Sequence, residues 1–235
     1  MKCVSIGITL IISLLLSACS SIQPTSKPGQ TTIATTTVAT VDTVSSATLS
    51  RYRENEIRDY QGERLDPAIG PSDNSISGVQ HVDINDYRLS INGLVDSPLE
   101  LTYDDVLKLT AVERLITIHC VTGWQATILW RGVQLSEILE LATIKPEANT
   151  VIFHCVDGYT TSLPLSTIID NKLIMAYNSN GLPLPDEMGY PFIIVAENKL
   201  GYKWARWVNQ IELSADENYQ GFWESIGYDN VANLN

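Results

Sequence analysis

The sequence predicts an α+β fold with mixed sheets. Many short apolar runs are separated by glycine, asparagine and proline turns, which is typical of strands, whereas few segments have helical spacing. Strands that outnumber short helices, without strict alternation of the two, indicate the α+β class. Hydrophobic residues make up 44% of the chain, enough for a substantial core. Beyond its N-terminal segment the chain therefore suits one domain, or two small domains that share a core.

The first residues have the pattern of an export signal. Lys2 provides a positive start, and the apolar stretch 6–16 is shorter than the roughly 20 residues that cross a bilayer. Leu16-Ser17-Ala18-Cys19 resembles a bacterial lipobox, which implies a lipoprotein signal peptide over 1–18 and lipidation of Cys19. The alternative is an ordinary secretory signal with an incidental cysteine. We therefore expect a lipid-anchored protein at the extracytoplasmic face of the cell membrane.

The segment 19–50 is expected to be a disordered tether. It is rich in serine and threonine, contains Pro24 and Pro28, and lacks long apolar periodicity. The folded domain should then cover 51–235. Its first part, 51–68, is charged and is expected to be irregular.

Within this domain, short apolar or alternating runs bounded by turn residues predict strands. They cover 87–95, 115–119, 150–155, 159–163, 173–177, 191–196 and 208–213. Asn180-Gly181 is typical of a hairpin turn after the fifth of these strands.

Two helices are expected between the strands. Thr102 and Asp105 have the spacing of a capping box, which predicts a short helix over 103–109. Apolar residues at i, i+3, i+4 and i+7 over 135–142 predict an amphipathic helix. We expect Trp130-Arg131-Gly132 to open that second helix.

The bulk charge and the cysteine count exclude some classes of protein. The net charge of −12 and the pI of about 4.6 argue against nucleic acid as a partner and against charge-driven docking on an anionic membrane. Two of the four cysteines, Cys3 and Cys19, fall in or beside the leader. The chain is therefore not a disulfide scaffold.

The dipeptides His119-Cys120 and His154-Cys155 each end a predicted strand, and three interpretations compete. A zinc site using all four residues is disfavoured, because adjacent strand residues point to opposite faces and the spacing lacks the usual close pairs. A disulfide between the two cysteines is plausible in an exported protein. In the third interpretation, Cys120 is the sole protein ligand of a metal cofactor and Cys155 is a small buried neighbour.

The third interpretation is supported by an ordered set of motifs. Cys120-Val121-Thr122-Gly123-Trp124 is followed by pieces at 130–135, 157–165, 180–185, 189–191, 201–204 and 222–228. Each piece alone is weak, but the set resembles bacterial and archaeal members of the sulfite oxidase superfamily, whose metal loop is of the Cys-Val-x-Gly-Trp type. The resemblance covers roughly 74–228 and implies a mixed-sheet, sulfite-oxidase-like molybdopterin-binding fold.

The resemblance implies a molybdopterin-dependent oxidoreductase. It places molybdenum, with tungsten as the alternative metal, on the thiolate of Cys120, and it places Tyr159 in the catalytic pocket facing the metal. Further cofactor contacts are implied for residues of three segments, with Lys203 and Arg206 facing a phosphate; these residues are Asn74, Cys155, Lys203, Trp204 and Arg206.

The expected chemistry is two-electron oxygen-atom transfer on a small-molecule substrate, with electrons exchanged through a membrane-bound or soluble partner. Sulfite-oxidising members carry two arginines just after the metal cysteine. Gly123-Trp124 stands there in this chain, so reduction of a sulfoxide or an N-oxide is expected instead.

Two other functions remain open from the sequence. Ile193 stands where many relatives have an arginine, which favours a cofactor-free envelope binding module that retains the fold. The pair Cys120 and Cys155 also suits a thiol redox protein.

Overall fold

The computed structural model describes residues 46–70 and 75–234. The expected leader, Cys19 and Asn74 lie outside the described residues. Within them, no helix has both the length and the apolar character needed to cross a membrane.

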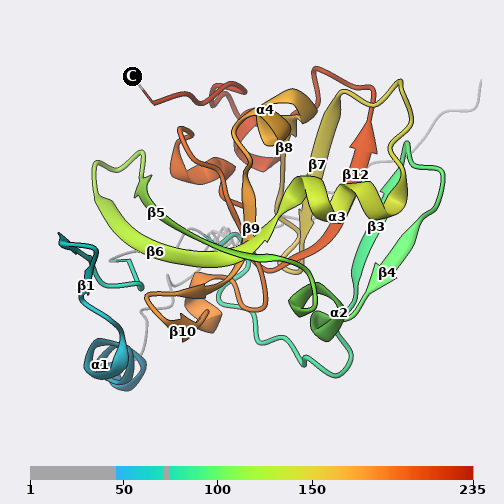
Figure 1. The fold of residues 1–235 in the computed structure, drawn as a ribbon. Coiled ribbons are helices and arrows are strands. Elements are labelled where there is room, and N and C mark those ends of the chain that lie inside the picture. Colours follow the sequence, from blue (N-terminus) through green and yellow to red (C-terminus); the bar gives the residue numbers. More distant parts are fainter. Residues whose placement is uncertain (1–45, 71–74, 235) are drawn as a thin grey trace, which may run out of the picture. The chain divides into compact units, whose positions relative to one another are not determined.

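Two five-stranded sheets build the domain (Figure 1). The first has the order β10-β9-β6-β5, with β11 also paired to β9, and all of its pairs are antiparallel. Its strands are β5 (Ala111–His119), β6 (Gln125–Gln134), β9 (Ile174–Ser179), β10 (Leu182–Pro183) and β11 (Ile193–Val195).

The second sheet has the order β4-β3-β12-β7-β8. Its strands are β3 (Leu89–Gly93), β4 (Leu99–Leu101), β7 (Thr150–Cys155), β8 (Thr160–Pro164) and β12 (Val208–Ser214). The pair β12–β3 is parallel and the other pairs are antiparallel, so this sheet is mixed. The α+β class with mixed sheets is confirmed.

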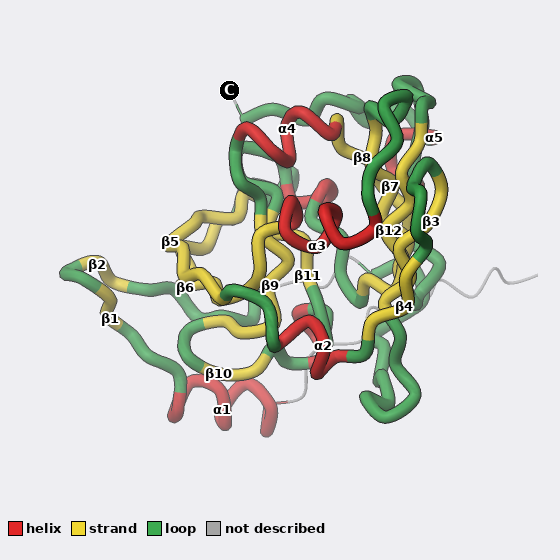
Figure 2. The backbone as a smooth tube through the Cα atoms, turned by 45° about the vertical axis from the view of Figure 1, so that its right-hand side comes forward, coloured by secondary structure: helices red, strands yellow, loops and turns green. Residues whose placement is uncertain are grey.

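Helix α3 (Leu135–Ala142) lies between the two sheets (Figure 2). Its apolar positions, Leu135, Ile138, Leu139 and Ala142, are completely buried, as the helical spacing predicts. This amphipathic helix thus packs between β6 and β3, and its outer side carries Glu137, Glu140 and the exposed Leu141.

The capping box at Thr102 is also confirmed. The Thr102 hydroxyl accepts from the Asp105 backbone N–H and the Asp105 carboxylate accepts from the Thr102 backbone N–H, so both orphan donors are satisfied. The helix that follows, α2 (Tyr103–Leu107), ends two residues before the expected Leu109.

The expectation that Trp130-Arg131-Gly132 opens a helix is wrong. These residues lie inside β6, which is hydrogen-bonded to β5 on one side and to β9 on the other. Strand pairing on both edges satisfies the backbone groups that a helix would have satisfied internally. The helix begins only at Leu135, where β6 ends.

The N-terminal segment is more ordered than expected. Helix α1 (Ser46–Asn55) includes the last five residues of the predicted tether, and a small hairpin of β1 (Asp59–Tyr60) and β2 (Glu63–Arg64) follows it. The Tyr52 hydroxyl donates to the carbonyl of Pro183 at 2.8 Å, which holds α1 against β10. The residues that make this contact are far apart in the sequence, so no local sequence pattern predicts it.

Two further short helices were not expected. They are α4 (Leu165–Asp170), which follows β8 directly, and α5 (Phe222–Ser225), which lies in the C-terminal tail. Short 3₁₀ turns, η1 (Asp186–Met188) and η2 (Gly201–Lys203), lie in the loops before β11 and β12.

Replacing Gly132 by alanine should destabilise the fold. A Cβ at this position would overlap the carbonyl oxygen of Met175 on β9, at the irregular point of the β6–β9 pairing. We expect the free energy of unfolding to fall by about 2–3 kcal/mol, the usual cost of overpacking, as measured by urea denaturation.

The control is Gly62→Ala. Gly62 has a positive φ of 88°, but a Cβ added there would meet no atom within 4 Å, so only backbone strain of about 1 kcal/mol is expected. Equal losses in the two variants would contradict the steric explanation.

Candidate functional site

Cys120 lies in the tight loop that joins β5 to β6. The last pair of the ladder is His119 with Gln125, and the loop between them is closed by two backbone hydrogen bonds, from Cys120 to Trp124 (2.9 Å) and from Gly123 to Cys120 (3.0 Å). Gly123 has φ of 93°, a conformation that glycine adopts without a steric cost. The alternating strand and the glycine turn therefore present the thiol at the end of the hairpin.

This thiol lies in the wall of a cavity of about 320 Å³. Four parts of the chain meet there: the segment that contains Ser75, the β5–β6 loop with the end of β5, the turn η2 with the residues after it, and the C-terminal tail. The described lining residues are Ser75, Ile118, Cys120, Val121, Thr122, Trp124, Gly201, Tyr202, Arg206, Trp223 and Tyr228. Most of the lining is apolar or aromatic, with few polar groups, which is typical of a pocket for a cofactor or a small molecule.

The backbone of η2 runs directly beside the Cys120 loop. His119 and Leu200 form a parallel bridge, and a Cβ on Gly201 would lie 3.2 Å from the His119 carbonyl oxygen and 3.7 Å from Cys120 Cα. Only a glycine lets the two backbones approach this closely without displacement. The loop that carries the thiol is therefore packed closely against the backbone at the start of η2.

The donor set at Cys120 suits a soft metal held by one thiolate. Cys120 Sγ is partly exposed to the cavity and lies 3.1 Å from the Thr122 hydroxyl oxygen. Across residues 46–70 and 75–234, no group of three or more His, Cys, Asp or Glu side chains could hold a metal ion. The donors present thus match a metal whose other ligands come from a cofactor, and they do not match a four-ligand zinc centre.

Arg206 is the cation among the described cavity-lining residues. It is 6% exposed, and its Nη1 donates to the carbonyl of Glu187 at 3.1 Å. Its backbone pairs with that of Ile193 in an isolated antiparallel bridge. Arg206 therefore lies beside the residue that stands where many relatives have an arginine. The next residue, Trp207, has a positive φ of 52°, an unusual conformation for a bulky side chain, and such strain is concentrated at functional sites.

Tyr159 and Trp204 do not line the Cys120 cavity among its described walls. Both line a small neighbouring pocket with Arg206. The Tyr159 hydroxyl donates to the carbonyl of Tyr202, and burial raises the pKa of Tyr159 above its ordinary value. In this structure the Tyr159 hydroxyl holds the backbone of η2, and the expected placement of Tyr159 facing the metal pocket stays a prediction.

The position of Lys203 also differs from the expectation. Its side chain is completely buried and its ammonium pairs with the carboxylate of Glu224 on α5. It also donates to the carbonyl of Ser162 (3.1 Å) and to Asn230 Oδ1 (2.9 Å). Burial lowers the pKa of Lys203 while Glu224 opposes the shift. With its three donors used inside the protein, Lys203 is unsuited to the phosphate contact expected of it.

Cys155 lies at the end of β7 and is buried, outside the described lining of the cavity. Burial raises the pKa of its thiol well above the ordinary value, with the nearby Asp157 carboxylate adding to the shift. Cys120 and Cys155 are both free thiols, so the structure does not contain the disulfide considered from the sequence.

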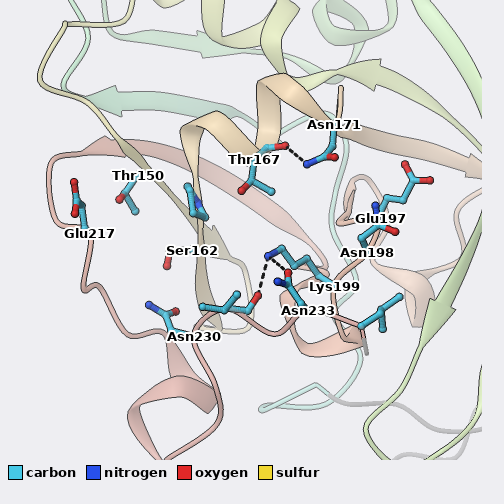
Figure 3. Close-up of a pocket in the computed structure, with 13 residues that line it drawn as sticks. Thr150, Ser162, Thr167, Asn171, Glu197, Asn198, Lys199, Glu217, Asn230 and Asn233 are labelled. Carbon is cyan, nitrogen blue, oxygen red and sulfur yellow. Dashed lines mark hydrogen bonds between the residues drawn. The ribbon is translucent and has the colours of Figure 1, made fainter.

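A larger cavity of about 650 Å³ has different chemistry (Figure 3). It is lined by hydroxyl, amide and carboxylate groups, together with Lys199, whose ammonium donates to Val231 and to Asn233 Oδ1. It contains no cysteine among its described lining residues. We therefore assign the functional site to the smaller cavity that contains Cys120.

Sequence reasoning missed the wall supplied by the C-terminal tail, Trp223 and Tyr228. Their rings pack at 5.1 Å, and Tyr228 packs on Tyr202 at 5.3 Å. The signal was an unusual density of aromatic residues in 222–228, outside any periodic element. That density did not by itself show which part of the domain the tail covers.

The buried pair Lys203–Glu224 yields a stability prediction. Lys203→Met leaves the Glu224 carboxylate buried and unpaired, so the free energy of unfolding should fall by about 3–5 kcal/mol. Combining it with Glu224→Met removes both charges and should recover most of that loss. Urea denaturation of the single and double variants measures this.

The control is Lys108→Met. Lys108 pairs with Asp105 in the open, with 72% of its side chain exposed, and its removal should change stability little. If the double variant were as unstable as the single one, the charge-burial explanation would be wrong.

Comparison with known proteins shows the family of this chain. The family model of the oxidoreductase molybdopterin binding domain matches residues 76–223. The uncharacterized oxidoreductase YuiH of Bacillus subtilis is 40% identical over 147 residues, covering 62% of this chain and 74% of that protein. A putative protein-methionine-sulfoxide reductase subunit, YedZ1 of Azospira oryzae, is 31% identical over 151 residues, covering 64% of this chain and 57% of that protein.

A solved structure, the sulfane dehydrogenase SoxCD from Paracoccus pantotrophus, has a similar fold. Its TM-score is 0.57 at 27% identity, over 60% of this chain and 41% of that one. The chain thus spans only part of the length of these relatives. The family match, the mixed sheets and the single cavity thiol agree with the ordered motifs, and the chain belongs to the oxidoreductase molybdopterin-binding domain family of the sulfite oxidase superfamily.

Proposed function

We propose that this molybdopterin-family oxidoreductase transfers an oxygen atom from a sulfoxide or an N-oxide, with molybdenum held on Cys120. The observation that carries the proposal is the single thiol of Cys120 in the wall of a largely apolar cavity. When bound, the molybdenum centre supplies two-electron oxygen-atom transfer. Tungsten would suit the same thiolate, and metal analysis of the purified protein distinguishes the two.

The residues around the cavity have separate roles in this proposal. The Thr122 hydroxyl lies 3.1 Å from Cys120 Sγ and would donate a hydrogen bond to a metal-bound thiolate there. Arg206 provides positive charge for the cofactor phosphate from the inner side of the cavity, in an otherwise acidic protein. The Gly201 backbone keeps the thiol loop in place through its close approach to His119.

The substrate class follows from the residues that come after the cysteine. Gly123 and Trp124 stand where sulfite-oxidising relatives have arginines, so nothing in the loop favours a sulfite dianion. An uncharged sulfoxide or N-oxide suits an apolar wall better. The putative protein-methionine-sulfoxide reductase subunit among the relatives supports this choice. Such a reaction needs a separate electron-transfer partner.

A thiol redox function is less well supported. A redox cysteine must be able to form a thiolate, and burial raises the pKa of the Cys155 thiol. A cofactor-free binding module would have no need for a thiol in the cavity wall, although Ile193 remains a departure from the arginine of many relatives.

Cys120→Ser should abolish reduction of methyl p-tolyl sulfoxide with reduced benzyl viologen as the electron donor. Serine is a harder donor whose pKa lies far above the ~8.5 of a thiol, so it replaces a thiolate poorly. The fold should persist, because the change removes little volume at a loop position. Activity, molybdenum content and thermal stability are measured together.

Cys155→Ser is the matched control and should retain most of the activity. If wild-type protein contained no molybdenum or tungsten, or if both variants kept full activity, the proposed function would be wrong. Similar stability losses of about 2–5 kcal/mol for both variants would instead support a disulfide.

We also propose that the mature protein is anchored through lipid on Cys19 at the extracytoplasmic face of the membrane. The support is the lipobox-like sequence that ends at Cys19. Cys19→Ala should move the protein from the membrane fraction to the soluble fraction, as followed by immunoblot after a salt wash. A variant that stays with the membrane after the wash would refute lipid anchoring.

A further inference from the structure

The larger cavity of Figure 3 lies apart from the site of Cys120. Its volume of about 650 Å³ is within the usual range for pockets that bind small molecules. It lies at the end of β7 and β8 where Thr150 pairs with Pro164, whereas Cys155 stands at the other end of β7. The two cavities have no described lining residue in common, so the proposed oxygen-atom transfer does not account for the larger one.

The ammonium of Lys199 is the feature of this cavity that calls for an explanation. Lys199 is 7% exposed, and Figure 3 shows its side chain pointing inward among the labelled residues. It donates to the carbonyl of Val231 at 2.8 Å and to Asn233 Oδ1 at 2.7 Å, both in the C-terminal tail. Hydrogen bonds within the described part of the chain thus use two of its three N–H donors.

The charge of Lys199 also lacks compensation. Among the described carboxylates, none forms an ion pair with it, and the carboxylate of Glu224 is already paired with Lys203. Burial lowers the pKa of Lys199 and the nearby Lys203 lowers it further, while Asp229 opposes the shift. A buried charge without an opposite charge is costly, and a bound anion would compensate it.

Other polar groups of the lining are available to a ligand. Thr167 is half-buried and Asn198 is exposed, and both line the cavity. Within residues 46–70 and 75–234, no hydrogen bond joins the Thr167 hydroxyl or the Asn198 amide to another group. Hydroxyl and amide side chains both donate and accept hydrogen bonds, so they suit a ligand that carries several hydroxyl groups.

Two glutamates in the lining limit the charge of the ligand. Glu197 pairs with Arg114, and Glu217 accepts from the Asn149 amide at 2.9 Å. Both keep acceptor capacity, because a carboxylate has about four lone-pair sites. They would repel an anion with several charges, and they would accept from the hydroxyl groups of a ligand.

We propose that this cavity is a second binding site, which takes a small hydroxylated carboxylate of the sugar-acid kind. The carboxylate of the ligand accepts from the Lys199 ammonium and compensates its charge. The hydroxyl groups of the ligand bind among Thr167, Asn198 and the two glutamates. A simple dianion such as phosphate fits this lining less well, because it offers no hydroxyl chain and meets the two carboxylates.

The test measures the binding of D-gluconate and of sorbitol by calorimetric titration at constant ionic strength. Sorbitol has the same hydroxyl chain, with an alcohol in place of the carboxylate. We expect the wild type to bind gluconate roughly tenfold more tightly than sorbitol, the value of a hydrogen bond to a charged group. Lys199→Met removes the charge and keeps an unbranched side chain, so its Kd for gluconate should rise by that factor while its Kd for sorbitol changes little.

Lys108→Met is the control for a general effect of net charge, because Lys108 is exposed at the end of α2. It should bind both ligands like the wild type. Three results would overturn the inference: no binding of gluconate by the wild type, equal affinity for the two ligands, or an unchanged preference in Lys199→Met. Lys199 would then have only the structural role of holding the C-terminal tail.

If Lys199→Met does not fold, Thr167→Val decides. This change removes a lining hydroxyl and keeps the branched shape of the side chain. We expect the Kd for gluconate to rise roughly threefold, the value of one neutral hydrogen bond. Wild-type affinity in this variant would refute the site.

The inference does not depend on the proposed function. Gluconate binding is measured without turnover, whereas metal content and sulfoxide reduction test the Cys120 site. A failure of one therefore leaves the other unchanged.

Discussion

The buried ion pair between Lys203 and Glu224 joins the two parts of the chain that close the cavity. Lys203 ends η2, whose backbone runs beside the Cys120 loop, and Glu224 lies on α5 next to Trp223. Both charges are fully buried and neither is solvated by water, so removing one would leave the other without compensation at a large cost in stability. The pair therefore fixes the tail on the domain, and with it one wall of the site.

The same constraint explains why the cavity has few polar groups. The ammonium of Lys203 and the hydroxyl of Tyr159 are both used to hold backbone or tail atoms around η2. What remains of the polar groups in the described lining is the Cys120 thiol, a few hydroxyls and Arg206. A soft ligand and a cation in an apolar wall form a restricted set, and that set favours a thiolate-bound cofactor with a small, weakly charged substrate.

Local patterns were reliable wherever the structure uses local interactions. The capping box at Thr102 and the apolar spacing of 135–142 depend on contacts within a few residues, and both predicted helices are present, although α2 ends two residues early. The region 130–132 was misassigned because its backbone partners, on β9, are more than 40 residues away along the chain. The helix at 46–55 was missed for a similar reason, since its anchor is the carbonyl of Pro183.

The sequence by itself determined the fold class, the family and the position of Cys120 at the end of a strand, because these depend on residue type, order and short spacing. Only the tertiary structure decided which side chains reach the cavity. In the structure the Tyr159 hydroxyl donates to the backbone of η2 and the Lys203 ammonium pairs with Glu224, whereas Trp223 and Tyr228 line the cavity. The physical reason is that a side chain's role depends on the partners that long-range packing places around it, and a buried charge takes the nearest opposite charge regardless of sequence distance.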